Sequence, residues 1–143
     1  MTVPTIRHCM LVTAQAFGVG LDGLRGERRS APLIHARQVA MYLAHELTGA
    51  SLSGLGRAFG RDHSTVARSV TKVRESMAED TELAALIADL DRRARRLAAE
   101  DHAASRDEAL IDRMTAEFRT RLSDAVAEVR AETERQAHGG GRD

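Results

Sequence analysis

The 143-residue sequence has few aromatic residues, cysteines and prolines: one cysteine, two prolines, no tryptophan and 3% aromatic residues. A lone cysteine cannot form an internal disulfide bond or a cysteine-rich zinc site, and this usage is typical of the reducing cytoplasm. The scattered aromatic side chains are too few to stack the bases of single-stranded nucleic acid. We therefore expect a cytoplasmic protein with no metal centre, in which Cys9 is a small buried apolar residue.

Long apolar runs and glycine-rich nucleotide motifs are also missing. The longest uncharged stretch, residues 9–21, is shorter than the roughly 20 apolar residues that span a membrane. Neither GxxxxGK[ST] nor GxGxxG occurs in the sequence, so a phosphate-binding loop of either class is not expected. The sequence thus predicts no membrane contact, no bound nucleotide, no cofactor and no enzymatic activity.

Helix-breaking residues are concentrated in the first half of the chain. Both prolines and eight of the eleven glycines lie at or before Gly60, and the other glycines form the run 139–141. The residues between 61 and 138 are dominated by Ala, Arg, Glu and Leu, which favour helix. The composition therefore predicts an all-α fold whose second half is long helix.

The charge is balanced overall but unevenly distributed. The 21 basic residues equal the 21 acidic ones, which, taken alone, argues against nucleic-acid binding. Residues 1–75, however, hold ten basic and five acidic side chains, a net charge of +5, whereas residues 76–143 hold 11 and 16, a net charge of −5. This asymmetry indicates a basic binding module followed by an acidic extension.

The first half is divided into helices by apolar spacing and glycine. We expect helices over residues 3–17 and 36–48, each followed by a glycine. Between them we expect a loop that begins at residue 21, because Pro32 is excluded from a helix interior.

A pair of short helices follows. Ser51 can cap one helix, which ends at Gly60, and the next begins at Asp62 or His63. A helix, a tight glycine turn and a second helix form the outline of a helix-turn-helix motif.

The second helix of this motif has an apolar face and a polar strip. The expected buried face is Val66, Val70, Val73 and Met77. The strip on the opposite side, at about 100° per residue, is Arg61, Ser64, Thr65, Arg68 and Lys72. An ordinary solvated face fits this pattern as well as a DNA-binding surface does. The absence of acidic residues from the strip before Glu75 favours the DNA-binding surface.

Apolar periodicity continues into the second half, weakens over residues 100–105 and resumes after a predicted capping box, Ser105 with Glu108. Over residues 111–129 the spacings are 3, 4, 4, 4 and 3, closer to a 3.6 than a 3.5 period. This favours packing against the chain itself or a partner over an extended coiled coil. We expect domains over 1–95 and 96–135, the latter a helical extension for oligomerisation or partner binding, and a disordered tail over 136–143.

Two sequence strings are more specific than any periodicity. RQVAMYL at residues 37–43 is followed by FGRDHSTV at 59–66, with FGV at 17–19 and RRS at 28–30 upstream. Together they resemble the DNA-binding domain of the DnaA family of bacterial replication initiators over about residues 3–95. The resemblance implies an all-helical, Trp-repressor-like helix-turn-helix bundle that binds double-stranded DNA.

The resemblance also implies roles for individual residues. Arg29 would enter the minor groove, and the base contacts in the major groove would come from Asp62, His63, Ser64 and Thr65. The implied backbone contacts are Arg28, Arg37, Gln38, Ser51, Arg61, Arg68 and Lys72. These types suit the roles, since Thr offers a methyl group to thymine and an extended Arg suits the narrow groove of A·T-rich DNA. Ala31 and His45 depart from the family, which commonly has basic residues there.

The resemblance begins near the start of the chain, so the ATPase domain that precedes this module in the initiator is not expected. The leading hypothesis is a non-enzymatic regulator of replication initiation that assists or competes with the initiator at DnaA-box sites. Two alternatives stay open: a transcription regulator that uses the same motif at promoters, and an adaptor that acts through its acidic helical tail. Besides duplex DNA, the expected partners are the initiator or a second copy, bound through residues 76–135.

Overall fold

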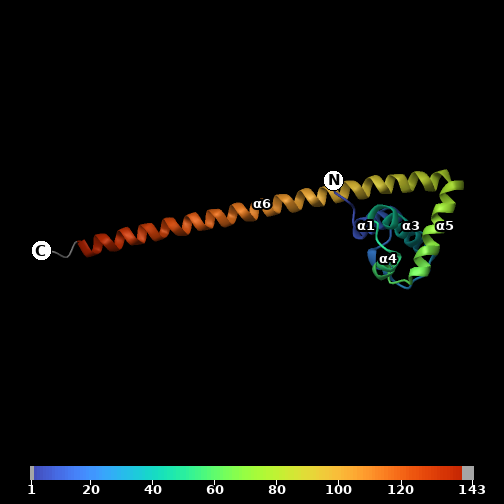
Figure 1. Ribbon diagram of the computed structural model, residues 1–143, viewed down its shortest axis with the longest axis horizontal. Coiled ribbons are helices and arrows are strands. Elements are labelled where there is room, and N and C mark those ends of the chain that lie inside the picture. The colour runs from blue at the N-terminus through green and yellow to red at the C-terminus, as the bar shows by residue number, and fades with distance from the viewer. Residues whose placement is uncertain (1, 140–143) are drawn as a thin grey trace. The chain divides into compact units, whose positions relative to one another are not determined.

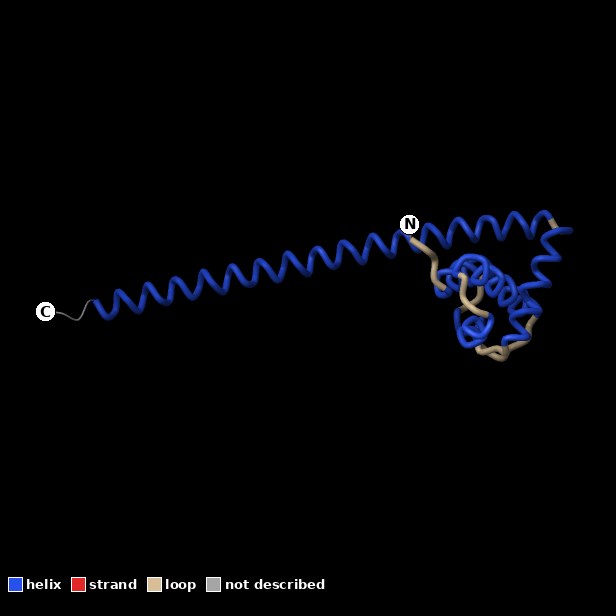
Figure 2. The backbone as a smooth tube through the Cα atoms, viewed as in Figure 1, coloured by secondary structure: helices blue, strands red, loops and turns tan. Residues whose placement is uncertain are grey.

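The computed structural model describes residues 2–139, which are helical apart from short connections and contain no strand (Figures 1 and 2). The helices are α1 (Ile6–Phe17), α2 (Leu21–Arg25), α3 (Ala31–Thr48), α4 (Leu52–Phe59), α5 (His63–Glu79) and α6 (Thr81–Gly139). The all-α prediction is confirmed. The chain forms two units, residues 1–102 and 103–143, and none of the described helices has the length and apolar composition of a membrane span.

The first helix has a complete N-terminal cap. The Thr5 hydroxyl accepts a hydrogen bond from the His8 backbone N–H at 3.3 Å, and the Thr5 N–H donates to His8 Nδ1 at 3.0 Å. This reciprocal pair satisfies two backbone groups that a helix start would otherwise leave unpaired. At the other end Gly18 takes a left-handed conformation, with φ of 66°. The helix predicted over 3–17 is thus present and ends as predicted, but it begins three residues later, at Ile6.

The next helices differ in detail from the sequence prediction. Residues 21–25 of the expected loop form the short α2, and α3 begins at Ala31 instead of residue 36. Pro32 lies in the first turn of α3. Its missing N–H has no helical partner at that position, so proline is compatible with a helix start although not with a helix interior.

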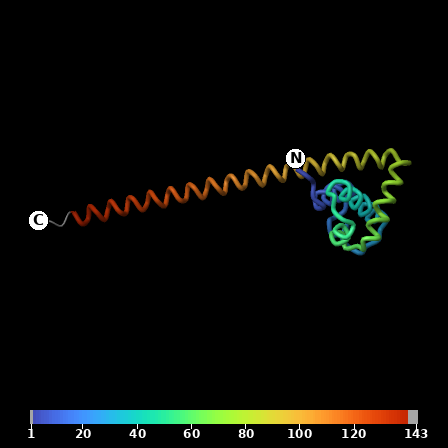
Figure 3. The backbone as a smooth tube through the Cα atoms, in the orientation of Figure 1, coloured from blue at the N-terminus to red at the C-terminus, as the bar shows by residue number. Residues whose placement is uncertain are grey.

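The core of the first unit lies around α3, which packs against α1 and α5. Its largest fully buried side chains are Phe59, Met10, Leu24, Met41, Leu43, Leu55 and Leu90. Cys9 is buried as expected, and burial raises the pKa of its thiol to about 12, so the reactive thiolate form is suppressed. Figure 3 follows the chain through this unit from α1 in blue to α5 in green.

The helix-turn-helix is formed by α4 and α5, as the sequence predicts. Ser51 caps α4 by accepting from the Gly54 N–H at 3.0 Å, and Gly60 ends it with φ of 64°. Gly56 lies against the turn: a Cβ built on it would be 2.5 Å from the Arg61 carbonyl oxygen. Glycine at this position is what allows the turn to pack so closely on α4.

The apolar face of α5 is also as predicted, because Val66, Val70 and Val73 are buried and Met77 is partly buried. After α5, the Asp80 carboxylate accepts from the Glu82 and Leu83 N–H groups at 3.0 and 3.1 Å and so caps the start of α6.

The last helix runs without a break from Thr81 to Gly139. The predicted helix start at Ser105 is therefore wrong. The weak apolar pattern marks the end of burial and not the end of the helix. Ala98 is the last buried side chain of α6, and no glycine or proline follows it before residue 139. Residues 136–139 form the end of α6, and the rest of the predicted tail, 140–143, lies outside the described residues.

The close approach at Gly56 gives a prediction for stability. We expect Gly56→Ala to lower the free energy of unfolding by about 1–3 kcal/mol, since the added methyl group meets backbone and not a movable side chain. Urea denaturation measures this. Gly54→Ala, in the same helix, is the matched control: its methyl group meets side chains alone, Ser51 at 3.2 Å and Arg57 at 3.9 Å, so a cost as large as that of Gly56→Ala would contradict this explanation.

Candidate nucleic-acid interface

The interface predicted from sequence begins at the N-terminus of α5. Asp62 is the capping residue, and its carboxylate accepts from the Ser64 N–H at 3.2 Å and from the Ser64 hydroxyl. His63 Nδ1 lies 3.4 Å from the other carboxylate oxygen, and the His63 side chain is 64% exposed. The cap therefore fixes the backbone of the first turn while the His63 ring remains accessible to a ligand.

The same contacts change the acidity of Asp62. Hydrogen bonds from the Ser64 side chain and backbone, together with His63, hold the pKa of the Asp62 carboxyl below its ordinary value of 3.8. Asp62 is thus ionised at neutral pH, where a negative charge also suits the positive end of the α5 dipole.

Arg37 holds the loop between α2 and α3. Its Nε donates to the Leu24 carbonyl at 2.9 Å, and its Nη2 lies 2.9–3.1 Å from the carbonyls of Gly23, Gly26 and Arg28. Only 6% of Arg37 is exposed. One guanidinium group therefore holds together the segment that carries the two exposed arginines of the loop.

A second arginine binds the same loop from the helix-turn-helix side. Arg61 Nη1 donates to the Gly60 carbonyl at 3.0 Å and to the Arg25 carbonyl at 3.5 Å, and its Nη2 donates to the Gly26 carbonyl. The Gly26 carbonyl thus accepts from both Arg37 and Arg61. Through these bonds the basic loop is tied to α3 and to the turn between α4 and α5.

The result is a hollow where the loop meets the start of α5, lined by Glu27, Arg29, Ile34, Arg37, Arg61 and Thr65. Burial first, and then the charges of Arg61 and Arg29, lower the pKa of Arg37. Positive charge exceeds negative charge in this hollow. An anionic ligand would offset the repulsion among the three guanidinium groups.

The predicted residues fall into four overlapping groups. The base-contact residues Arg29 and Thr65 line one hollow, and Asp62, His63 and Ser64 lie in the adjoining first turn of α5. Gln38 and Lys72 line a second hollow together, between α3 and α5. Arg28, Arg68, Lys72 and Ser51 are exposed, with Ser51 serving as the cap of α4. Arg37 and Arg61 direct several of their donors to the loop, and their phosphate contacts stay predictions.

The anchoring role of Arg37 was not predicted, although the sequence carries a signal for it. Arg37 lies on the apolar side of α3, next to Ala36 and near Ala40, both of which are fully buried. A charged residue on a buried helix face needs hydrogen-bond partners. Carbonyls of a preceding glycine-containing loop are such partners, but their position depends on the tertiary fold.

The Asp62 cap gives a prediction for pH dependence. Because its folded-state pKa is depressed, the stability it contributes is present above the unfolded-state value of about 3.8 and is lost as pH falls through the lower folded-state value. We expect Asp62→Asn to lower the melting temperature at neutral pH, because the charge is lost, and the difference from the unsubstituted protein to shrink as pH falls below about 4.

Thermal melts followed by circular dichroism between neutral pH and pH 2.5 measure this difference. Ser64→Ala removes the hydroxyl donor that most lowers the pKa of Asp62, so it should also reduce the pH dependence. A difference between Asp62→Asn and the unsubstituted protein that is constant across this range would show that the charge is not involved.

Sequence comparisons support this description of the first unit. Residues 6–73 match the family model of the bacterial dnaA protein helix-turn-helix. The chain is 47% identical over 74 residues to the chromosomal replication initiator protein DnaA of Mycobacteroides abscessus, covering 52% of this chain and 15% of that protein. It is 42% identical over 88 residues to DnaA of Deinococcus deserti, covering 62% of this chain and 19% of that protein. The chain thus spans less than a fifth of the length of these relatives.

Structure comparisons agree. A solved structure of a DNA replication initiation factor matches with a TM-score of 0.57 and 27% identity, over 65% of this chain and 30% of that chain. A structure of the replication initiator DnaA bound to AMPPCP and single-stranded DNA matches with a TM-score of 0.53 and 28% identity, over 62% of this chain and 28% of that chain. Residues 6–73 therefore form a DNA-binding helix-turn-helix domain of the DnaA type.

Proposed function

We propose that this chain binds double-stranded DNA in a sequence-specific manner at DnaA-box-like sites and that it regulates replication initiation by assisting or competing with the initiator. The observation that carries the proposal is the shared hollow of Arg29 and Thr65. This arrangement supports contact of a loop arginine and the first turn of α5 with one duplex in two adjacent grooves. This function needs no catalytic step.

Specificity is assigned to the first turn of α5 and to Arg29. In the major groove, Thr65 offers a methyl group for thymine, and His63 and Ser64 offer hydrogen bonds to base edges. Asp62 can accept from a cytosine amino group with the acceptor capacity that Ser64 leaves free. Arg29 is exposed at the end of the anchored loop, which suits insertion into the narrow and negative minor groove of A·T-rich DNA.

Affinity is assigned to the surrounding backbone contacts. Lys72 and Arg68 project from the exposed side of α5, and Gln38 lies beside Lys72 in the second hollow. Arg28 and Ser51 supply further polar groups at the surface. Such contacts fix the register of the protein on the duplex and carry no sequence information themselves. Arg37 and Arg61 contribute to binding by positioning the loop, in addition to any phosphate they reach.

This assignment separates two substitutions on α5. We expect His63→Ala to weaken binding to a DnaA-box duplex by about 1–3 kcal/mol and to leave a scrambled duplex unaffected, because a base contact is lost. Lys72→Ala should weaken both duplexes alike and reduce the salt dependence of binding by about one phosphate contact. Fluorescence anisotropy titrations of both duplexes over a salt series measure these effects.

The control is His138→Ala, which removes an exposed histidine of α6 in the second unit and should change neither affinity. Equal affinity of the unsubstituted protein for the DnaA-box and scrambled duplexes would contradict sequence-specific binding. The regulatory part of the proposal is tested separately by genome-wide occupancy, where enrichment at the replication origin supports it and enrichment confined to promoters contradicts it.

A further inference from the structure

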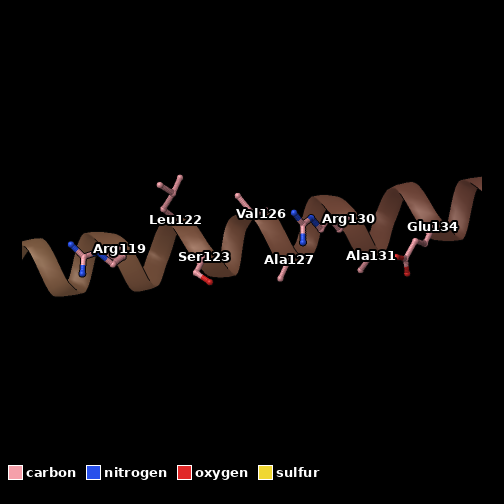
Figure 4. A pocket seen from close by; sticks show the side chains of 8 residues that line it. All are labelled: Arg119, Leu122, Ser123, Val126, Ala127, Arg130, Ala131 and Glu134. Atoms are coloured by element: carbon pink, nitrogen blue, oxygen red, sulfur yellow. The ribbon is translucent and has the colours of Figure 1, made fainter.

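The second unit contains an apolar stripe with no partner among the described residues. Seven large apolar side chains of α6 are between 44% and 67% exposed: Leu110, Ile111, Met114, Phe118, Leu122, Val126 and Val129. Figure 4 shows Leu122 and Val126 projecting from one side of the helix and Ser123 and Ala127 from the other. A continuous stripe of this kind marks an interaction surface.

The spacing of the stripe is symmetrical. The six residues from Ile111 to Val129 are separated by 3, 4, 4, 4 and 3 positions, which reads the same in both directions about residue 120. Two antiparallel copies related by a two-fold axis at this position would place Ile111 opposite the second copy's Val129. Met114 would then face Val126, and Phe118 would face Leu122. A two-fold interface requires this kind of self-complementary surface.

The charges beside the stripe include opposite-charge pairs in the same arrangement. At about 100° per residue, Glu117 and Arg121 lie on one flank, and Asp112 and Arg130 lie on the other. In the antiparallel register Glu117 lies within two residues of the second copy's Arg121, and Asp112 lies within two residues of its Arg130. The two-fold axis makes each of these pairs occur twice.

The register also contains unfavourable pairs: the Arg121 side chains of the two copies would face each other on one flank, and Glu117 would lie within one residue of the second copy's Asp124. The Arg119 side chains of the two copies would face each other near the axis, and this repulsion lowers the affinity. Like-charge and opposite-charge pairs are thus similar in number, so the apolar stripe and not the flanking charge drives the association.

The size of the contact fits a modest but specific dimer. From Ile111 to Val129 the helix is about 27 Å long, and twelve half-exposed apolar side chains, six from each copy, would be covered. The area buried is on the order of 1,000 Å², near the lower limit of specific interfaces. The average spacing of 3.6 residues favours two nearly straight helices over a long left-handed supercoil.

We propose that residues 111–129 of α6 form an antiparallel homodimer with the same segment of a second copy of this chain. This goes beyond DNA binding and does not depend on it. The spacing of this stripe is complementary to that of a second copy, whereas an unrelated partner need not share its symmetry.

Sedimentation velocity of the full chain at increasing concentration tests the association. We expect a monomer–dimer equilibrium, which Phe118→Asp should weaken at least tenfold. Ala116→Asp, which adds the same charge on the opposite face of the helix, should leave the equilibrium unchanged. Glu117→Arg should also weaken it, and the double variant with Arg121→Glu should restore it, while Arg119→Ala should strengthen it.

Cysteine cross-linking tests the orientation in a Cys9→Ala background, which removes the natural thiol. A mixture of Ile111→Cys and Val129→Cys chains should form disulfide-linked dimers, and neither variant alone should do so. Efficient cross-linking of either variant alone would indicate parallel helices and overturn the proposal. A full chain that remains monomeric at all concentrations, or binding that is equally sensitive to Phe118→Asp and Ala116→Asp, would also overturn it.

Discussion

The convergence of Arg37 and Arg61 on the carbonyls of one short loop is the interaction on which the first unit depends as a binding surface. The loop, residues 26–30, lies between two helices and none of its own residues is buried, so apolar packing alone holds it weakly. Charge-assisted bonds to carbonyls replace that packing. The Gly26 carbonyl, which accepts from both arginines, joins the α3 side of the unit to the helix-turn-helix side.

This arrangement gives the basic residues different tasks. Arg37 and Arg61 use their donors inside the protein, whereas Arg29, Arg68 and Lys72 are exposed to a ligand. Arg29, Arg37 and Arg61 repel one another in one hollow, and an anion bound there would offset this repulsion. The net charge of +5 over residues 1–75 therefore does not describe these separate roles. Some of the basic side chains position the loop, and the others are available for contact with a ligand.

The helix-turn-helix could be predicted from the sequence because its determinants are local. Ser51 and Asp62 cap helices within three residues of themselves, and Gly60 supplies the left-handed turn between them. The start of α3 at Ala31 and the unbroken course of α6 were missed, since proline at a helix start and a capping motif inside a helix are both ambiguous in sequence. The role of Arg37 could not be predicted because its acceptors lie 9–14 residues away and meet it only after folding.

We propose that Arg37 affects DNA binding by positioning Arg29. A double-mutant cycle on the affinity for a DnaA-box duplex tests it most directly, with Arg29→Ala and Arg37→Lys made separately and together. If Arg37 positions the loop, the loss caused by Arg29→Ala should be much smaller in the Arg37→Lys background, because lysine keeps the charge but cannot bind several carbonyls. Strictly additive losses would show that Arg37 does not act through Arg29.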